Sequence, residues 1–135
     1  ANITSRFGGR NLTVNGVTTS WHNGLDIGAP ERTPIVAYMD GVIDVVQDQG
    51  DKGYGKFVKI KHSDDCYTLY GHMIKWAVKA GDTVKKGDVI GYVGSTGRST
   101  GNHLHFEYRK GPNYGDAIDP LSKLSNYREI LNWGD

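Results

Sequence analysis

The chain has 135 residues, an ordinary length for one domain with a single hydrophobic core. Hydrophobic residues make up 37% and charged residues 23%, and 19 residues are glycine, a composition that favours a turn-rich globular β protein over a disordered chain or a helical bundle. The net charge of +1 supports neither nucleic acid nor an anionic membrane as a partner. No stretch approaches the roughly 20 apolar residues that cross a bilayer, which argues against membrane insertion.

The chain carries few signals of compartment or of internal division. Its single cysteine, Cys66, excludes an internal disulfide and leaves the redox compartment open. The chain begins at Ala1 without an initiator methionine or a signal-like apolar segment, and no repeat or low-complexity linker divides it. We therefore expect a single domain over residues 1–135, excised from a longer protein.

Short segments with an apolar residue at every second position predict strands at residues 35–37, 42–46, 57–61 and 66–70. Glycines separate these segments at close intervals, as at Gly50, Gly53, Gly55, Gly81, Gly87 and Gly97. Such spacing predicts an all-β fold made mainly of antiparallel sheet. Near the C-terminus, Leu121, Leu124 and Ile130 fall at roughly helical spacing after a proline, which predicts one short helix.

The first segment with potential chemistry is His22-Asn23-Gly24-Leu25-Asp26. A neutral imidazole and a carboxylate are suitable zinc ligands, and Gly24 lets the backbone bend so that both reach one ion. The same pair is also typical of a surface loop, so alone it does not identify a metal site.

The second segment contains His103-Leu104-His105-Phe106-Glu107 after a glycine-rich loop. Residues two apart on a strand share a face, so His103, His105 and Glu107 point one way while Leu104, Phe106 and Tyr108 point into the core. This pattern favours metal binding and a pair of hydrogen-bonded structural histidines about equally.

The third segment ends a predicted strand at Tyr70-Gly71-His72, where alternation places Tyr70 and His72 on one face. His72 is a candidate proton carrier, although a lone histidine here is also typical of an exposed strand end. Tyr70 is a candidate to orient substrate or stabilise charge, although a tyrosine at a strand end is more often a packing residue. His62, which alternates with two apolar residues, is interpreted as structural.

Together these segments resemble the M23 family of zinc metallopeptidases, the group that contains lysostaphin and the LytM-type peptidoglycan hydrolases. The resemblance covers nearly the whole chain and keeps the family's motif order, which is far more specific than any single motif. The motifs that carry it include Ser5-Arg6-Phe7-Gly8, His22-x-Gly24-x-Asp26, Tyr70-Gly71-His72-Met73 and Gly97-x-Ser99-Thr100-Gly101-x-His103-Leu104-His105-Phe106-Glu107.

The resemblance implies one Zn²⁺ per chain, with His22, Asp26 and His105 as ligands and His72 and His103 as catalytic histidines that do not coordinate it. Three protein ligands leave a fourth position for water. The implied activity is that of an endopeptidase that uses a metal-activated water to hydrolyse peptide bonds in the cross-bridges or stem peptides of bacterial peptidoglycan. The two histidines are expected to deprotonate this water and to support the oxyanion or the leaving amine, in either assignment.

The implied architecture is a groove floored by the sheet and walled by loops around residues 8–20, 47–55, 73–78 and 95–102. The aromatic candidates for its lining are Trp21, Tyr54, Tyr70 and Tyr114. The implied partner is a peptidoglycan peptide, and we expect a monomeric domain without nucleic acid partners. The implied location is extracellular or in the cell wall, either secreted or virion-associated in the case of a phage protein.

Two other classes of function compete with this interpretation. The first is a catalytically inactive LytM-like module that binds cell wall or regulates another hydrolase, although such modules typically lose metal ligands. The second is a lipoyl- or biotinyl-type carrier, which the Gly81-Asp82 and Gly87-Asp88 turns resemble. A carrier needs an attachment lysine in an Asp-Lys-Ala or Met-Lys-Met hairpin, and this sequence has neither.

Overall fold

The computed structural model of the protein describes residues 2–9, 13–14, 17–18, 21–63, 65–97, 99 and 101–132. Strands dominate this part of the chain, as predicted. They are β1 (Asn2–Ser5), β2 (Gly8–Gly9), β3 (Thr13–Val14), β4 (Val17–Thr18), β5 (Trp21–His22), β6 (Leu25–Gly28), β7 (Pro34–Val36), β8 (Gly41–Asp48), β9 (Lys56–Ser63), β10 (Cys66–Trp76), β11 (Thr83–Val84), β12 (Val89–Val93), β13 (His103–Arg109) and β14 (Ala117–Ile118). No helix among the described residues is long and apolar enough to cross a membrane.

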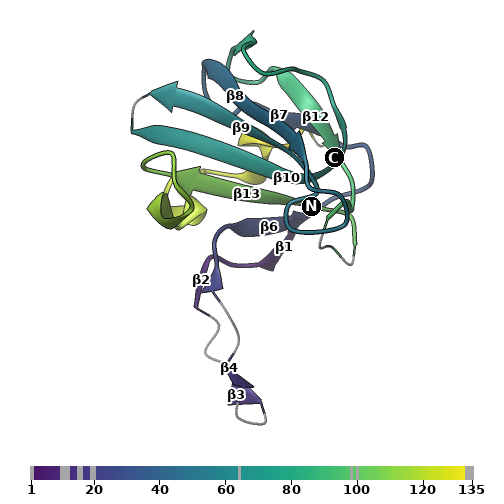
Figure 1. The fold of residues 1–135 in the computed structure, drawn as a ribbon, viewed down its shortest axis with the longest axis vertical. Helices are drawn as coiled ribbons and strands as arrows, with labels where there is room; N and C mark the ends of the chain where they lie inside the picture. The colour runs from purple at the N-terminus through teal and green to yellow at the C-terminus, as the bar shows by residue number, and fades with distance from the viewer. Residues whose placement is uncertain are drawn as a thin grey trace.

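Ten of these strands form one sheet in which every pairing is antiparallel. Its main path runs β1-β6-β13-β10-β9-β8-β11, with β12 pairing with β10 and β7, and β14 pairing with β13. The part of this path from β1 to β8 can be followed in Figure 1. Two small pairs, β2 with β5 and β3 with β4, lie outside this sheet. The predicted antiparallel all-β architecture is confirmed.

The core forms because one face of each central strand is apolar. On β13, Leu104 and Phe106 are fully buried, and on β6 Leu25 and Ile27 are at most 2% exposed. Burying one such side chain contributes about 1.5–3 kcal/mol. Because side chains alternate along a strand, the residues between these apolar ones on β6 and β13 point to the opposite face of the sheet. The site described below lies on that opposite face.

The predicted C-terminal helix is replaced by two separate 3-10 turns, η2 (Pro120–Ser122) and η3 (Tyr127–Glu129). Each turn begins with its own cap, because Asp119 Oδ1 accepts from the Leu121 amide and Asn126 Oδ1 accepts from the Arg128 amide. The prediction of one helix is therefore wrong. Apolar side chains from both turns pack on the core, and that shared packing explains the helix-like spacing.

A bulge in β10 overturns the predicted shared face of Tyr70 and His72. Tyr70 pairs with Val58 and Met73 pairs with Lys56, so three steps along β10 oppose two along β9. His72 absorbs the extra residue in a left-handed conformation, with φ of 62°. As a result, Tyr70 and Met73 lie fully buried in the core while His72 lines the groove.

Tyr70 and His62 have the packing and structural roles inferred from the sequence. The Tyr70 hydroxyl accepts from the Tyr38 amide at 3.0 Å and from Thr68 Oγ1 at 2.8 Å. His62 is bound between the carbonyl of Asp40, at 2.9 Å, and Thr68 Oγ1, at 2.7 Å. Neither Tyr70 nor His62 lines the groove. The expectation that Tyr70 is a candidate lining residue is therefore wrong.

Two glycines bring the loop before β9 against the loop after β12. Gly55 and Gly97 both have positive φ, at 61° and 75°. A Cβ on Gly97 would overlap the backbone nitrogen of Gly55 and lie 2.6 Å from its Cα. The contact matters for the site because Tyr54 and Thr96, next to these glycines, provide the carbonyls that hold His72.

Gly97→Ala is expected to destabilise the protein more than Gly81→Ala. Both changes place a side chain on a left-handed residue, which costs about 1–2 kcal/mol, but a Cβ on Gly81 meets nothing within 4 Å. The overlap at Gly97 adds a further cost of about 1–3 kcal/mol. The free energies of unfolding measured in denaturant test this. Equal losses in the two variants would contradict the close approach of the loops.

Candidate metal centre

Four strands bring the five histidine and aspartate residues singled out in the sequence to one place. His22 ends β5 and Asp26 lies on β6, while His103 and His105 lie on β13. In the antiparallel register, Asp26 of β6 is directly opposite His105 of β13. His105 is in turn opposite Gly71 of β10, next to His72. All five side chains line a groove of about 680 Å³.

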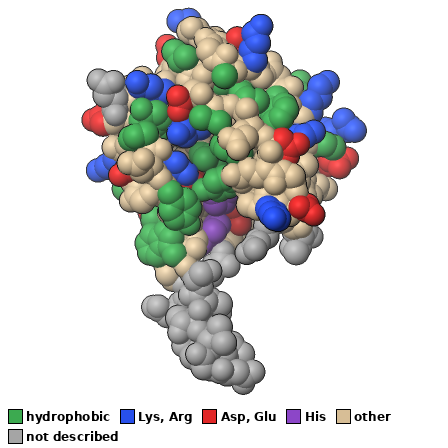
Figure 2. Space-filling model, in the orientation of Figure 1, with side chains coloured by type: hydrophobic (Ala, Val, Ile, Leu, Met, Phe, Trp, Pro, Cys, Tyr) green, Lys and Arg blue, Asp and Glu red, His purple; other side chains and the backbone are tan. Residues whose placement is uncertain are grey.

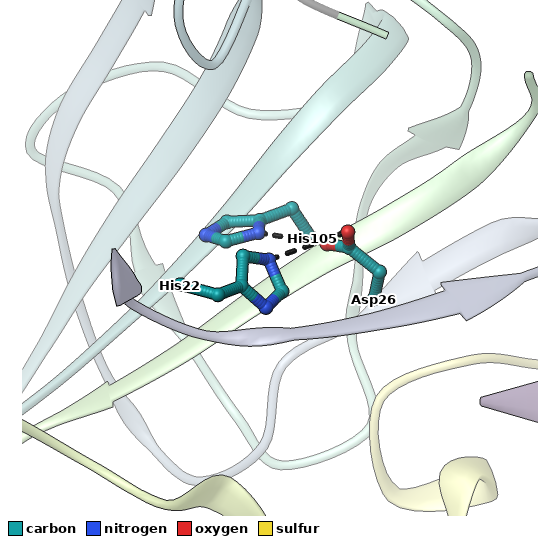
Figure 3. Close-up of side chains that lie close together, drawn as sticks. All are labelled: His22, Asp26 and His105. Carbon is teal, nitrogen blue, oxygen red and sulfur yellow. Dashed lines mark hydrogen bonds and ion pairs between the residues drawn. The ribbon is translucent and has the colours of Figure 1, made fainter. Parts of the chain in front are cut away.

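His22, Asp26 and His105 form a compact cluster (Figure 3). One potential ligand atom from each residue lies within 4.8 Å of the other two. Asp26 is the shared partner, with Oδ2 at 3.3 Å from Nε2 of His22 and Oδ1 at 2.8 Å from Nδ1 of His105. Two imidazoles and a carboxylate are a donor set that suits zinc, and three protein ligands leave a position open.

The far nitrogen of each clustered histidine is bound to the protein. Nδ1 of His22 donates to the carbonyl of Arg6 at 2.8 Å, which leaves Nε2 to face Asp26. Nε2 of His105 donates to Oε2 of Glu107 at 2.8 Å, which leaves Nδ1 to face Asp26. A hydrogen bond at the outer nitrogen is how proteins fix the tautomer and ring orientation of a metal-binding histidine.

His72 and His103 lie beside the cluster with their ring centroids 4.6 Å apart. Nδ1 of His72 donates to the carbonyl of Thr96 at 2.6 Å, and Nδ1 of His103 donates to the carbonyl of Gly101 at 3.0 Å. In the neutral form of each ring, this arrangement leaves Nε2 as a proton acceptor. The backbone amide of His72 also donates to the carbonyl of Tyr54 at 2.7 Å, so its left-handed backbone is held on both sides.

Burial and neighbouring charges shift the pKa values of these groups in opposite directions. Burial lowers the pKa of His72 to about 4, with further lowering from the nearby His103 and His105 rings. Burial also acts to lower the pKa of His105, but hydrogen bonds to Asp26 and Glu107 outweigh it and raise that pKa to about 9. Burial acts to raise the pKa of Asp26, yet His105 and His22 hold it well below its usual value.

The walls of the groove agree only in part with the predicted loops. Residues 47–55 contribute Gln49, Gly53 and Tyr54, and residues 95–102 contribute Ser99. The prediction that residues 73–78 form a wall is wrong, because β10 continues to Trp76 and pairs there with β12. Within residues 8–20, positions 10–12, 15–16 and 19–20 lie outside the described residues. Figure 2 shows histidine side chains recessed in a hollow beside hydrophobic ones.

Two exposed aromatic residues of the groove are joined by Asn23, a connection that the sequence did not reveal. Trp21 and Tyr114 line the groove and are 53% and 54% exposed. Nε1 of Trp21 donates to Oδ1 of Asn23 at 3.0 Å, and Nδ2 of Asn23 donates to the carbonyl of Tyr114 at 2.9 Å. Asn23 itself is buried. Trp21, Tyr54 and Tyr114 are therefore the predicted aromatic residues that do line the groove.

Gly24 is required by close packing and not by its backbone conformation. It does not have a positive φ. A Cβ at this position would lie 2.5 Å from the carbonyl oxygen of Phe106 and 2.8 Å from Cε1 of His105. Glycine therefore allows the segment between His22 and Asp26 to lie directly against β13.

On one face of an antiparallel sheet, a groove contains two imidazoles and one carboxylate, with two further histidines beside them. These features together are typical of a class of metallopeptidases. The sequence model of peptidase family M23 matches residues 20–120, and the chain belongs to this family. The DD-carboxypeptidase/endopeptidase Mpg of Neisseria meningitidis is 43% identical over 122 residues. That match covers 89% of this chain and 26% of Mpg, so the chain spans about a quarter of that relative.

Solved structures of similar proteins agree with the family assignment. The catalytic domain of the prophage-encoded M23 protein EnpA from Enterococcus faecalis has a TM-score of 0.78 and 40% identity, with 90% of each chain covered. A structure described as a zinc-containing peptidase from Vibrio cholerae has a TM-score of 0.77 and 36% identity, covering 89% of this chain and 36% of that one.

In the metal-free protein, the rings of His72 and His105 are expected to titrate far apart although their centroids are only 6.0 Å apart. Desolvation keeps His72 neutral down to a pKa of about 4, whereas the carboxylate hydrogen bonds keep His105 protonated up to about 9. Ring chemical shifts followed by NMR across pH, after removal of metal with a chelator, measure both values. A pKa of 6.5 or higher for His72, or below 6.5 for His105, would be inconsistent with the geometry described.

Proposed function

We propose that this chain is a zinc-dependent endopeptidase that hydrolyses peptide bonds in bacterial peptidoglycan, in its cross-bridges or stem peptides. The observation that carries the proposal is the His22, Asp26 and His105 cluster, which lines a groove with two further histidines beside it. Membership of family M23 and the zinc-containing relative support zinc as the metal. The name of Mpg as an endopeptidase, and that of the peptidoglycan DD-endopeptidase ShyC of Vibrio cholerae, support the substrate.

The donor set fits one zinc ion held by Nε2 of His22, the carboxylate of Asp26 and Nδ1 of His105. Zinc at this position would supply Lewis acidity, which polarises a carbonyl group and makes water a stronger nucleophile. In the metal-free protein both ring nitrogens of His105 face carboxylates, which favours the protonated ring. A cation at Nδ1 would replace that proton while the Glu107 hydrogen bond stays in place.

The catalytic proton transfers fall to His72 and His103. In hydrolysis the water oxygen bonds to the carbonyl carbon, the carbon–nitrogen bond breaks, and a proton must move from the water to the leaving amine. Nε2 of each ring is available because Nδ1 is held by a backbone carbonyl. The low pKa of His72 keeps this ring neutral near pH 7 and therefore able to accept a proton. The 4.6 Å between the ring centroids lets both act on one reacting centre.

The groove provides an aromatic surface for an extended peptide. Trp21 and Tyr114 are exposed, which suits direct contact with substrate, while Tyr54 packs near His105 with ring centroids 5.4 Å apart. We infer that the chain acts as a monomer outside the cell or in the cell wall, where peptidoglycan is found. Secretion and association with a phage particle are both compatible with this location.

Purified protein is expected to contain about one zinc per chain and to release soluble fragments from purified cell walls. Removal of zinc with a chelator should abolish the release, and stoichiometric zinc should restore it, because the cluster provides the ligands of the reactive metal. Elemental analysis and mass spectrometry of the fragments measure the metal and the cleaved bond. A chain that takes up no zinc under any loading condition would overturn the proposal and favour a regulatory, non-enzymatic module.

His105→Ala and His103→Ala are expected to fail for different reasons. His105→Ala removes a ligand, so both zinc retention and activity should be lost. His103→Ala should retain zinc but reduce turnover by about 10²–10⁴-fold, the usual contribution of a general acid or base. Zinc content after dialysis and initial rates on cell-wall fragments separate the two effects. Loss of zinc in both variants would show that the two roles are assigned wrongly.

A further inference from the structure

Glu107 is a completely buried carboxylate behind the candidate zinc ligands. An ionised carboxylate is costly to remove from water unless donors surround it. Oε1 of Glu107 accepts from Arg109, at 2.8 Å to Nε and 2.7 Å to Nη2, and from Nδ2 of Asn23 at 3.1 Å. Oε2 accepts from the Tyr54 hydroxyl at 2.5 Å and from Nε2 of His105 at 2.8 Å. Four side chains thus fix both oxygens.

The contact with His105 has a direct chemical consequence. A carboxylate accepts hydrogen bonds and donates none when ionised, so Nε2 of His105 must carry the proton. Nδ1, which faces Asp26 and His22, then becomes the ring nitrogen that is free to bind a metal. The ring is also confined sterically, since Gly24 lies against Cε1 of His105 and Cγ of Glu107.

We propose that Glu107 is a positioning residue that fixes the tautomer and orientation of His105 and thereby sets the zinc affinity of the site. The inference rests on the proposed function, because it concerns the same metal. Glu107 contacts none of the reacting atoms and acts through His105. Its partner Asn23 also binds Trp21 and the Tyr114 carbonyl, so the same carboxylate joins the aromatic walls of the groove to the metal ligand.

The competing explanation is that Glu107 only neutralises Arg109, another buried side chain. The two explanations predict different behaviour when both charges are removed together. Replacing a buried ion pair with apolar side chains of similar volume often leaves stability unchanged, whereas removing one partner leaves an uncompensated charge. The double variant Glu107→Met/Arg109→Met therefore removes the His105 contact without leaving a buried charge from this pair.

The test compares the parent chain with Glu107→Met/Arg109→Met, and with Arg109→Lys as the matched control, which keeps a positive charge beside Glu107 and the Glu107–His105 hydrogen bond. Zinc affinity is measured by competition with a chromogenic chelator, and the coordination sphere by the visible spectrum of the Co²⁺-loaded protein. Circular dichroism and thermal unfolding of the metal-free forms establish folding. Loss of an outer hydrogen-bond partner typically lowers metal affinity about 10–100-fold. The zinc affinity of the double variant should therefore fall by about 10–100-fold, and its Co²⁺ spectrum should differ from that of the parent. Arg109→Lys should keep the parent spectrum and an affinity within about threefold of the parent.

Glu107→Gln provides a second variant of nearly the same shape in case the double variant does not fold. Its amide has one acceptor oxygen, so it cannot satisfy both His105 and the Arg109 side chain, and zinc affinity should again fall by about tenfold or more. Parent-like zinc affinity and Co²⁺ spectrum in a folded double variant or in Glu107→Gln would overturn the role of Glu107 while leaving the zinc site intact. An Arg109→Lys variant that binds zinc as weakly as the double variant would also overturn it. A parent chain that binds no zinc would overturn the proposed function together with this inference.

Discussion

The antiparallel pairing of β6 with β13 is the constraint on which the site depends. It places Asp26 opposite His105, while Leu25, Ile27, Leu104 and Phe106 fill the core from the other face of the same strands. A slip of one residue would turn Asp26 into the core and an apolar residue into the groove, so the hydrophobic pattern itself fixes the register. The chemistry of the groove and the stability of the sheet are therefore set by the same interaction.

Backbone carbonyls and one buried carboxylate then orient the rings. His22, His72 and His103 each have Nδ1 bound to a carbonyl, whereas His105 has Nε2 bound to Glu107. The nitrogen on the other side of the ring is Nε2 in the first three and Nδ1 in His105, where it faces Asp26. Such fixed orientations reduce the reorganisation needed when a metal or substrate arrives. In the proposed mechanism, His22 and His105 hold the metal and the other two rings move protons.

The regular parts of the fold could be predicted from the sequence because local patterning decides them. Alternation identified the central strands and correctly placed Leu104 and Phe106 in the core, with His103 and His105 on the other face. The motifs around His22, His72 and His105 were enough to indicate family M23 before any distance was known. Assignment of individual roles to the five site residues remains a proposal.

The features that the sequence did not reveal depend on contacts distant along the chain. The bulge at His72 reverses the alternation, and it is held by carbonyls of Tyr54 and Thr96 that come from two separate loops. The apolar spacing near the C-terminus resembled one helix because two capped 3-10 turns pack on the same core. Alternation predicts that Glu107 shares a face with His105, but the hydrogen bond between Glu107 and Asn23 spans 84 positions and leaves no local pattern.

The most direct test of the central claim is the position of the metal itself. Crystals of the zinc-loaded chain, measured by anomalous diffraction at the zinc absorption edge, should show one strong peak in the groove. We predict bonds of about 2.0–2.2 Å to Nε2 of His22, the carboxylate of Asp26 and Nδ1 of His105, with His72 and His103 unbound. A peak bonded to His72 or His103, or the absence of zinc from the cluster, would contradict it.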